Sequence, residues 1–190
     1  MSEYPEFQVI MTDVYKSRSR EVFIESMKDQ KDIILETPFN NENFKDFADL
    51  AKGSGYRTYL VVLFLNSPSE SFDRVAARHA FEGGLDIPKE EVSYNFTENM
   101  KNVAKYYFYF DEAVFIYTGQ TRLNQHVMTF TEGRLVEYKP SDLDYIQRFA
   151  GYAHSIDRME SRDREIIAMN APFISERSVE LQSSKIRFRP

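Results

Sequence analysis

The alternation of apolar and polar positions divides the first third of the chain into short strands and helices. Residues 7–11 (FQVIM) and 31–37 (KDIILET) are apolar runs typical of strands, and residues 20–30 between them place apolar side chains at helical spacing. Residues 41–55 repeat that spacing and end in two glycines, which predicts an amphipathic helix. The continuous apolar run at 56–67 predicts a strand that is buried on both faces of a parallel sheet. This order of strand, helix and strand predicts an α/β fold.

Two further helices and a strand follow this apolar run. Residues 67–84 predict a helix that begins at a serine N-cap and ends at Gly83-Gly84. Pro88 lies near the first position of another predicted helix, where its missing N–H costs little, and residues 90–108 continue that helix. The apolar run at 112–118 predicts another strand. The two helices joined by a Gly-Gly turn suit a movable helical lid.

The last part of the chain predicts a hairpin and one more helix. Residues 126–130 and 134–140 flank Thr-Glu-Gly, which is typical of a hairpin at a sheet edge. Residues 141–161 predict a C-terminal helix, and the polar residues from about 175 to 190 predict a loose tail. Because the sequence contains no repeat and no linker, we expect a single domain over residues 1–190.

Composition narrows the class of protein further. The net charge of −6 argues against broad nucleic-acid binding, which needs a basic surface to neutralise phosphates. The chain has no cysteine, so disulfides and thiolate metal sites are excluded, and the three histidines are scattered without metal-ligand spacing. The strongest apolar run, residues 59–65, is too short to cross a bilayer. We therefore expect a cytoplasmic protein that binds neither membrane nor nucleic acid.

Polar residues at the predicted strand ends are candidates for chemistry. Asp13 follows the first strand, Glu36 and Thr37 end the second, and Arg74 and Arg78 lie on the helix after the third. Ligands of open α/β sheets bind at the carboxyl ends of strands. A carboxylate there, with arginines above it, suits phosphoryl transfer, in which the carboxylate accepts the hydroxyl proton and the arginines neutralise phosphate charge. The alternative is that Asp13 has no role and that the arginines are solvated surface charges.

The order of these residues adds a resemblance. The stretch from about residue 20 to residue 118 resembles the zeta-toxin family of P-loop kinases. Members of this family have a strand that ends in Glu-Thr, a Gly-Tyr before the next strand, an Arg-Val-x-x-Arg segment, a Gly-Gly pair and a step of valine or isoleucine to proline. The matching positions here are Glu36-Thr37, Gly55-Tyr56, Arg74-Val75 with Arg78, Gly83-Gly84 and Ile87-Pro88.

The resemblance implies a P-loop-kinase-like, mostly parallel sheet flanked by helices, and an ATP-dependent small-molecule kinase. The best-known reaction of the family is 3′-phosphorylation of UDP-N-acetylglucosamine. By this resemblance Glu36 and Thr37 would line the sugar-nucleotide site, Arg74 and Arg78 would contact ATP phosphates, and Asp13 would be the catalytic aspartate. The partners that it implies are a nucleotide or UDP-sugar and an antitoxin protein.

Three departures from the family pattern weaken the kinase interpretation. No Gly-x-x-x-x-Gly-Lys-Ser/Thr phosphate loop occurs in the sequence, so ATP and magnesium would need a loop supplied upstream of Met1. The family places a further arginine near residues 92–96 and a histidine after the Gly-Gly pair, whereas this chain has no cation at 92–96 and has Leu85 in the second place. The chain is therefore either a truncated or weakened kinase, or a non-catalytic binding or regulatory protein on a degenerate kinase fold.

Overall fold

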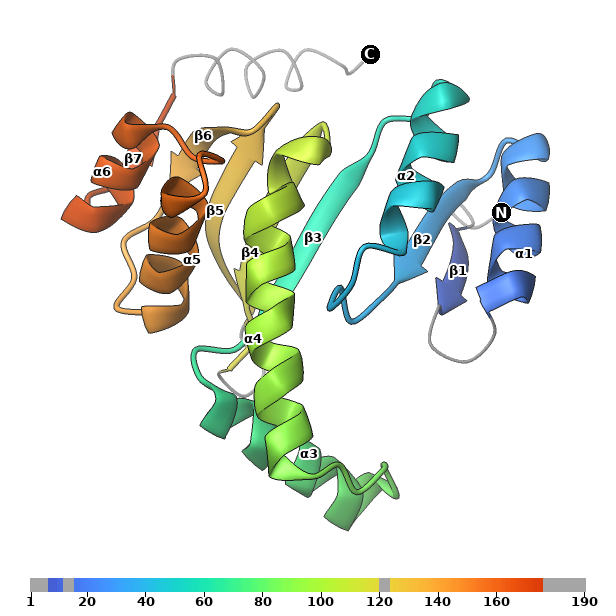
Figure 1. The fold of residues 1–190 in the computed structure, drawn as a ribbon, viewed down its shortest axis with the longest axis horizontal. Coiled ribbons are helices and arrows are strands. Elements are labelled where there is room, and N and C mark those ends of the chain that lie inside the picture. The colour runs from blue at the N-terminus through green and yellow to red at the C-terminus, as the bar shows by residue number, and fades with distance from the viewer. Residues whose placement is uncertain (1–6, 12–15, 120–123, 176–190) are drawn as a thin grey trace, which may run out of the picture. The chain divides into compact units, whose positions relative to one another are not determined.

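The computed structural model describes residues 7–11, 16–119 and 124–175. The chain divides into two compact units, unit 1 with residues 1–58 and unit 2 with residues 59–190. Each unit is described by itself (Figure 1). The single domain expected from the sequence stays a prediction.

Unit 1 is a strand–helix–strand motif followed by one helix. Its strands β1 and β2 pair in parallel, with Met11 opposite Glu36 at the carboxyl end. Its core is aromatic, because the ring of Phe23 on α1 packs edge-on against Phe47 on α2 at 5.0 Å. All four predicted elements are confirmed: β1 (Phe7–Met11), α1 (Lys16–Lys28), β2 (Asp32–Glu36) and α2 (Phe44–Gly53).

Unit 2 is built on a five-stranded sheet with the strand order β3-β4-β5-β6-β7. The predicted lid helices and the hairpin are present, and Glu132 and Gly133 form the hairpin turn with positive φ values of 51° and 78°. The elements are β3 (Tyr59–Phe64), α3 (Pro68–Glu82), α4 (Lys89–Tyr106), a 3-10 turn (Tyr107–Tyr109), β4 (Glu112–Tyr117), β5 (Gln125–Thr131), β6 (Arg134–Tyr138), α5 (Asp144–Ser155), α6 (Ser161–Met169) and β7 (Phe173–Ile174).

The strand pairing confirms an α/β protein but not a mostly parallel sheet. Among the described residues, β1–β2 and β3–β4 are parallel, whereas β4–β5, β5–β6 and β6–β7 are antiparallel. The two-residue turn at Glu132-Gly133 can join only antiparallel neighbours, since a parallel pair needs a crossover of a dozen or more residues. The helices α3 and α4 supply such a crossover between β3 and β4.

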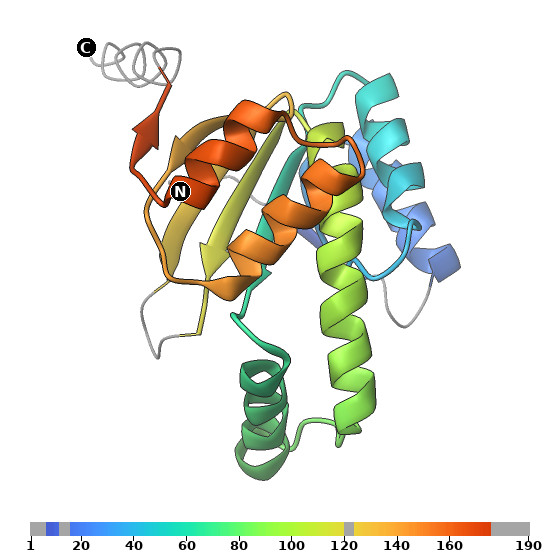
Figure 2. The same cartoon turned by 60° about the vertical axis from the view of Figure 1, so that its left-hand side comes forward.

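One face of the sheet in unit 2 carries the core. Helices α4 and α5 lie over this face (Figures 1 and 2). Fully buried Phe149 of α5 contacts Phe115 of β4, with ring centroids 4.7 Å apart, and Phe130 of β5 lies beside both rings. Tyr107 of the 3-10 turn is also buried here and contacts Phe149, with ring centroids 5.5 Å apart.

Strand β3 is buried on one face only, which differs from the sequence-based expectation. Its Val62 and Phe64 are buried, whereas Val61 is 55% exposed and Leu63 is 65% exposed. The reason is that α4 and α5 cover a single face of the sheet (Figure 1). An unbroken apolar run does not distinguish this arrangement from a strand covered on both faces.

The helix expected at 141–161 is α5, which ends earlier at Ser155, and α6 (Ser161–Met169) was not predicted. Asp157 adopts a left-handed conformation with φ 57°, which ends the helical course after Ser155. Arg158 N–H donates to Ala153 O at 2.9 Å across this turn. Aspartate is one of the few residue types that tolerate a positive φ, so the break has a local cause.

No helix in the part of the chain described is long and apolar enough to span a bilayer.

Asp163 in α6 is a buried carboxylate that ties α6 to the sheet. Its Oδ2 accepts a hydrogen bond from Leu135 N–H of β6 at 2.9 Å. Burial raises the pKa of Asp163, while the Leu135 N–H bond opposes that rise and Glu160 adds to it. The carboxyl therefore binds a proton more tightly in the folded than in the unfolded chain. The tighter binding of this proton stabilises the folded chain. That stabilisation is complete at pH values below the ordinary pKa of 3.8, and it is lost as the pH rises through the higher pKa of the folded chain.

Two substitutions of Asp163 separate its charge from its hydrogen bond. Asparagine keeps an oxygen acceptor for Leu135 N–H without a charge. We therefore expect the free energy of unfolding of Asp163→Asn, relative to that of the wild type, to be higher at pH 7 than at pH 4. Alanine leaves a buried N–H unpaired, and we expect Asp163→Ala to lower the free energy of unfolding by about 1–3 kcal/mol. Urea unfolding at both pH values measures each difference. An Asn variant with the same difference at both pH values would contradict the charge effect.

Candidate functional site

Five polar residues lie at the carboxyl ends of β3 and β4, and we call these five residues the strand-end cluster. The two parallel strands end at the same edge of the sheet, where Thr118 N–H donates to Phe64 O at 3.0 Å. Hydrogen bonds link the neighbouring members of the cluster, as described below. The strand-end cluster comprises Asn66, Glu70, Arg74, Tyr117 and Thr118.

The first turn of α3 fixes Glu70. Ser67 is the N-cap of α3, and its Oγ accepts from Glu70 N–H at 3.2 Å. The Glu70 carboxylate turns back and accepts from Asn66 N–H at 2.9 Å. Asn66 in turn accepts from Tyr145 N–H at 3.1 Å, which joins the loop to α5. The Ser-x-x-Glu spacing is the sequence signal that could have identified Glu70 as a capping residue.

Tyr117 at the end of β4 holds the Glu70 carboxylate from the other side. Its hydroxyl lies 3.3 Å from each carboxylate oxygen of Glu70 and donates to it. Burial raises the pKa of Tyr117, the negative charge of Glu70 raises it further, and Arg74 opposes the rise. The phenol therefore stays protonated at neutral pH and remains a donor. No pattern in the sequence pointed to this pair.

Arg74 lies one helical turn after Glu70 and points at the same edge of the sheet. Its Nη1 donates to Thr118 Oγ1 at 3.1 Å, and its Nη2 donates to the main-chain oxygen of Thr118. The side chain is exposed. A guanidinium has five N–H donors in a planar fork, so the two contacts with Thr118 orient it and leave donors for a ligand.

Arg78 lies on the same helix as Arg74 but is not a member of the strand-end cluster. It lies one turn further toward the end of α3 and is exposed, and its side chain has no hydrogen bond or ion pair with any residue that the structure describes. Its main-chain oxygen accepts from Gly84 N–H at 3.1 Å, with Gly83 in the left-handed conformation that ends α3. The spacing of four residues places Arg78 on the same helical face as Arg74.

The other predicted site residues belong to unit 1 or lie outside the described residues. Glu36 ends β2 and is exposed. Thr37 accepts from Phe39 N–H at 3.2 Å, and Phe39 has a φ of 53°, which is strained for a bulky residue. The ring of Phe39 stacks on Phe44 at 4.1 Å and holds this loop. Asp13 lies outside the described residues.

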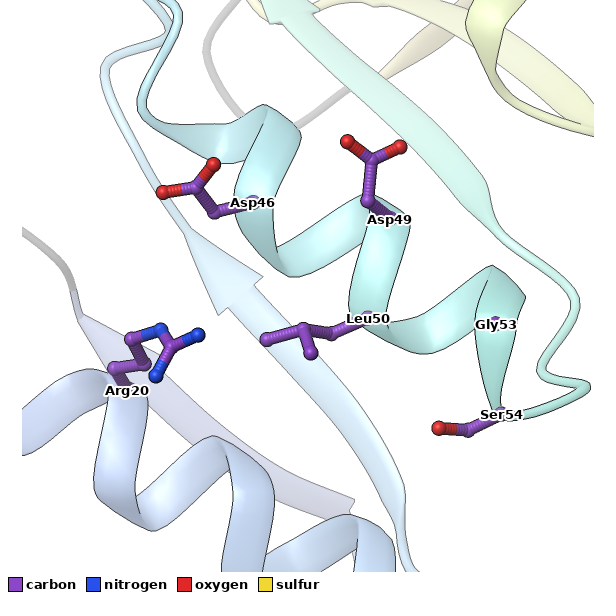
Figure 3. Close-up of a pocket in the computed structure, with 6 residues that line it drawn as sticks. All are labelled: Arg20, Asp46, Asp49, Leu50, Gly53 and Ser54. Carbon is purple, nitrogen blue, oxygen red and sulfur yellow. The ribbon is translucent and has the colours of Figure 1, made fainter.

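A shallow depression of about 590 Å³ lies between α1 and α2 in unit 1 (Figure 3). Arg20 of α1 points toward Leu50 of α2, and Asp46 and Asp49 also line the depression (Figure 3). Two carboxylates beside one guanidinium disfavour a bound anion. The surroundings of Arg20 therefore do not favour binding of a phosphate.

Gly119, directly after the strand-end cluster, has no room for a side chain. A Cβ there would collide with the hydroxyl and ring of Tyr117. We expect Gly119→Ala to displace Tyr117 from Glu70 and to cost about 1–3 kcal/mol of unfolding free energy, as overpacking does. Gly151→Ala is the matched control, because nothing lies within 4 Å of a Cβ at Gly151. Because alanine is a better helix former than glycine, we expect Gly151→Ala in α5 to raise the free energy of unfolding by about 0.5–1 kcal/mol. Urea unfolding of both variants tests the expectation, and two equally stable variants would contradict it.

Within the described residues, no group of three or more histidine or acidic side chains is arranged to hold a metal ion. Comparison with known proteins finds no matching family model, no matching curated protein and no matching solved structure. The resemblance to the zeta-toxin family therefore stays a prediction from the sequence.

Proposed function

We propose that this chain is a zeta-toxin-like kinase domain that binds a nucleotide phosphate at the strand-end cluster and whose catalytic power is weakened. The observation that carries the proposal is the position of Arg74, which Thr118 orients at the carboxyl ends of two parallel strands. This edge is where open α/β sheets bind their ligands. The planar fork of arginine matches a phosphate group, and the exposed guanidinium is accessible to one.

The remaining roles follow from the sequence resemblance and are part of the same proposal. Arg78 supplies a second phosphate contact from the same helical face. Glu36 and Thr37 line the site of a UDP-sugar, and Asp13 accepts the proton of the attacking hydroxyl. ATP supplies the phosphoryl group. The cluster fits a phosphate, but no group of metal ligands occurs among the described residues, so magnesium would depend on the nucleotide and on groups outside them.

Catalytic weakening follows from what the sequence lacks. None of its 190 residues forms a Gly-x-x-x-x-Gly-Lys-Ser/Thr loop, whose main-chain N–H groups and lysine hold the β- and γ-phosphates in P-loop kinases. An arginine that stabilises the transferring charge is worth about 10³–10⁵ in rate. Arg74 and Arg78 are the candidates for that role, and no cation occurs at residues 92–96.

A non-catalytic binding protein on a degenerate kinase fold is the second candidate. The observation that favours it is the strand pairing, since three of the five described pairs are antiparallel. Such a protein would keep a phosphate or sugar-nucleotide site without phosphoryl transfer. The two candidates differ in whether ATP binds and is consumed.

Isothermal titration calorimetry with ATP–magnesium, and separately with UDP-N-acetylglucosamine, tests the proposal. We expect both ligands to bind, and slow ATP consumption when both are present. Binding of the sugar nucleotide without ATP would overturn the kinase proposal and leave the binding protein. If neither ligand bound, both candidates would be wrong.

A further inference from the structure

Glu70 and Arg74 have the spacing of an ion pair within a helix, but they do not form one. They lie four residues apart on α3 with the acid first, which is the order that favours pairing on a helix surface. Asp144 and Arg148 on α5 have the same spacing and order, and these two side chains do form an ion pair at 3.9 Å. Among the described residues no ion pair joins Glu70 to Arg74. The surroundings of α3 must therefore keep the two charges apart.

Each of the two side chains has other partners in the strand-end cluster. The Oε2 atom of Glu70 accepts from Asn66 N–H at 2.9 Å. The Tyr117 hydroxyl lies 3.3 Å from both carboxylate oxygens, Oε1 and Oε2. The Arg74 guanidinium donates instead to two oxygens of Thr118. Because Asn66 holds Oε2 alone, Tyr117 is the partner that holds Oε1, the oxygen that would otherwise be available to Arg74.

This separation of charges matters for a site that binds phosphate. A carboxylate that pairs with a guanidinium neutralises its charge and takes up donors that a phosphate would use. Glu70 is the only acid among the residues three or four positions from Arg74 along α3, and these are the residues that share its helical face. We propose that Tyr117 is a positioning residue that holds Glu70 away from Arg74 and so keeps the guanidinium available to a phosphate ligand. This inference rests on the proposed function for its ligand, but not for the separation of the two charges.

Titration calorimetry with ATP–magnesium on four proteins tests the role of Tyr117. The proteins are the wild type, Tyr117→Phe, Glu70→Gln and the double variant. Phenylalanine keeps the ring and removes the hydroxyl, and glutamine keeps an oxygen acceptor for Asn66 N–H without a charge. We expect Tyr117→Phe alone to weaken ATP binding by about two- to fivefold, because the released carboxylate oxygen pairs with Arg74. In the Glu70→Gln background the same substitution should leave the affinity unchanged.

The comparison of the two backgrounds separates positioning from a merely structural role. If the Tyr117 hydroxyl only supported the local fold, its removal would weaken binding equally with and without the Glu70 charge, and this result would overturn the proposal. Unchanged affinity in Tyr117→Phe alone would also overturn it. Tyr152→Phe is the matched control, since the Tyr152 hydroxyl on α5 has no hydrogen bond with a residue that the structure describes. We expect this control to bind ATP as the wild type does.

Labelling with phenylglyoxal, followed by peptide mass spectrometry, tests the charge separation without any ligand. The reagent attacks a guanidinium that has lost a proton, and a paired carboxylate disfavours that loss. We expect Tyr117→Phe to slow the labelling of Arg74 by about two- to fivefold and the double variant to restore it, with Arg148 labelled equally in all four proteins. An unchanged rate at Arg74 in Tyr117→Phe would overturn the separation of charges. The expected labelling in a protein that does not bind ATP would support this separation and would overturn the proposed function instead.

Discussion

Replacing Arg74 with alanine is expected to weaken ATP binding by about 10- to 100-fold. Hydrogen bonds to a charged group contribute about 1.5–3 kcal/mol, and each 1.4 kcal/mol corresponds to a factor of ten in Kd. Lysine at this position keeps the charge but cannot donate to both Thr118 oxygens while it binds a phosphate in the planar manner of arginine. We therefore expect Arg74→Lys to recover only part of the affinity. Titration calorimetry with ATP measures all three proteins.

Arg148→Ala is the matched control for this experiment. Arg148 is an exposed arginine on α5, in the same unit, with one loose contact to Asp144 at 3.9 Å. Its removal makes the same change of charge without touching the strand-end cluster, so we expect unchanged affinity. Thermal unfolding of both variants excludes misfolding, because exposed sites away from caps and cores change stability by about 0.5 kcal/mol or less. Equal loss of affinity in both variants would show a general charge effect and would remove Arg74 from the site.

Local chemistry explains which parts of the fold were predictable. The Ser67 cap, the Gly83 turn and the hairpin turn at Glu132-Gly133 each act over a few residues, and the elements that they bound are confirmed. Apolar spacing located the strands for the same reason, since the period of two or 3.6 is a property of one segment. The helix break at Asp157 was missed because its signal is a single left-handed aspartate.

Strand pairing depends on residues far apart in the sequence, and this is where the sequence-based expectations differ from the structure. The pattern of strand, helix and strand suggested a unit from β2 through β3, but β2 pairs with β1 and β3 pairs with β4. Arg74 was a candidate from its place after a strand, whereas Tyr117 and Thr118 are 43 or more positions further along the chain. Only the parallel pairing of β3 with β4 brings these residues together.

Truncating Phe149 is expected to have the largest effect on stability. Phe149 is fully buried and contacts the rings of Tyr107, Phe115 and Phe130, which lie on three different elements. Removing the ring loses its transfer free energy and leaves a cavity, so we expect Phe149→Ala to lower the free energy of unfolding by about 3–5 kcal/mol. Urea unfolding followed by circular dichroism measures the change. Phe149→Leu fills more of the space and should cost less.

Phe81→Ala makes the same chemical change at an exposed position. We expect it to alter the free energy of unfolding by about 0.5 kcal/mol or less, because the ring of Phe81 is 88% exposed. The contrast between the two variants tests whether α5 packs on the sheet through the Phe149 cluster.

Because Tyr145 of α5 donates to Asn66, loosening α5 should also weaken ligand binding at the strand-end cluster. A Phe149→Ala variant as stable as Phe81→Ala would place the core of unit 2 elsewhere and would leave the strand-end cluster without its support from α5.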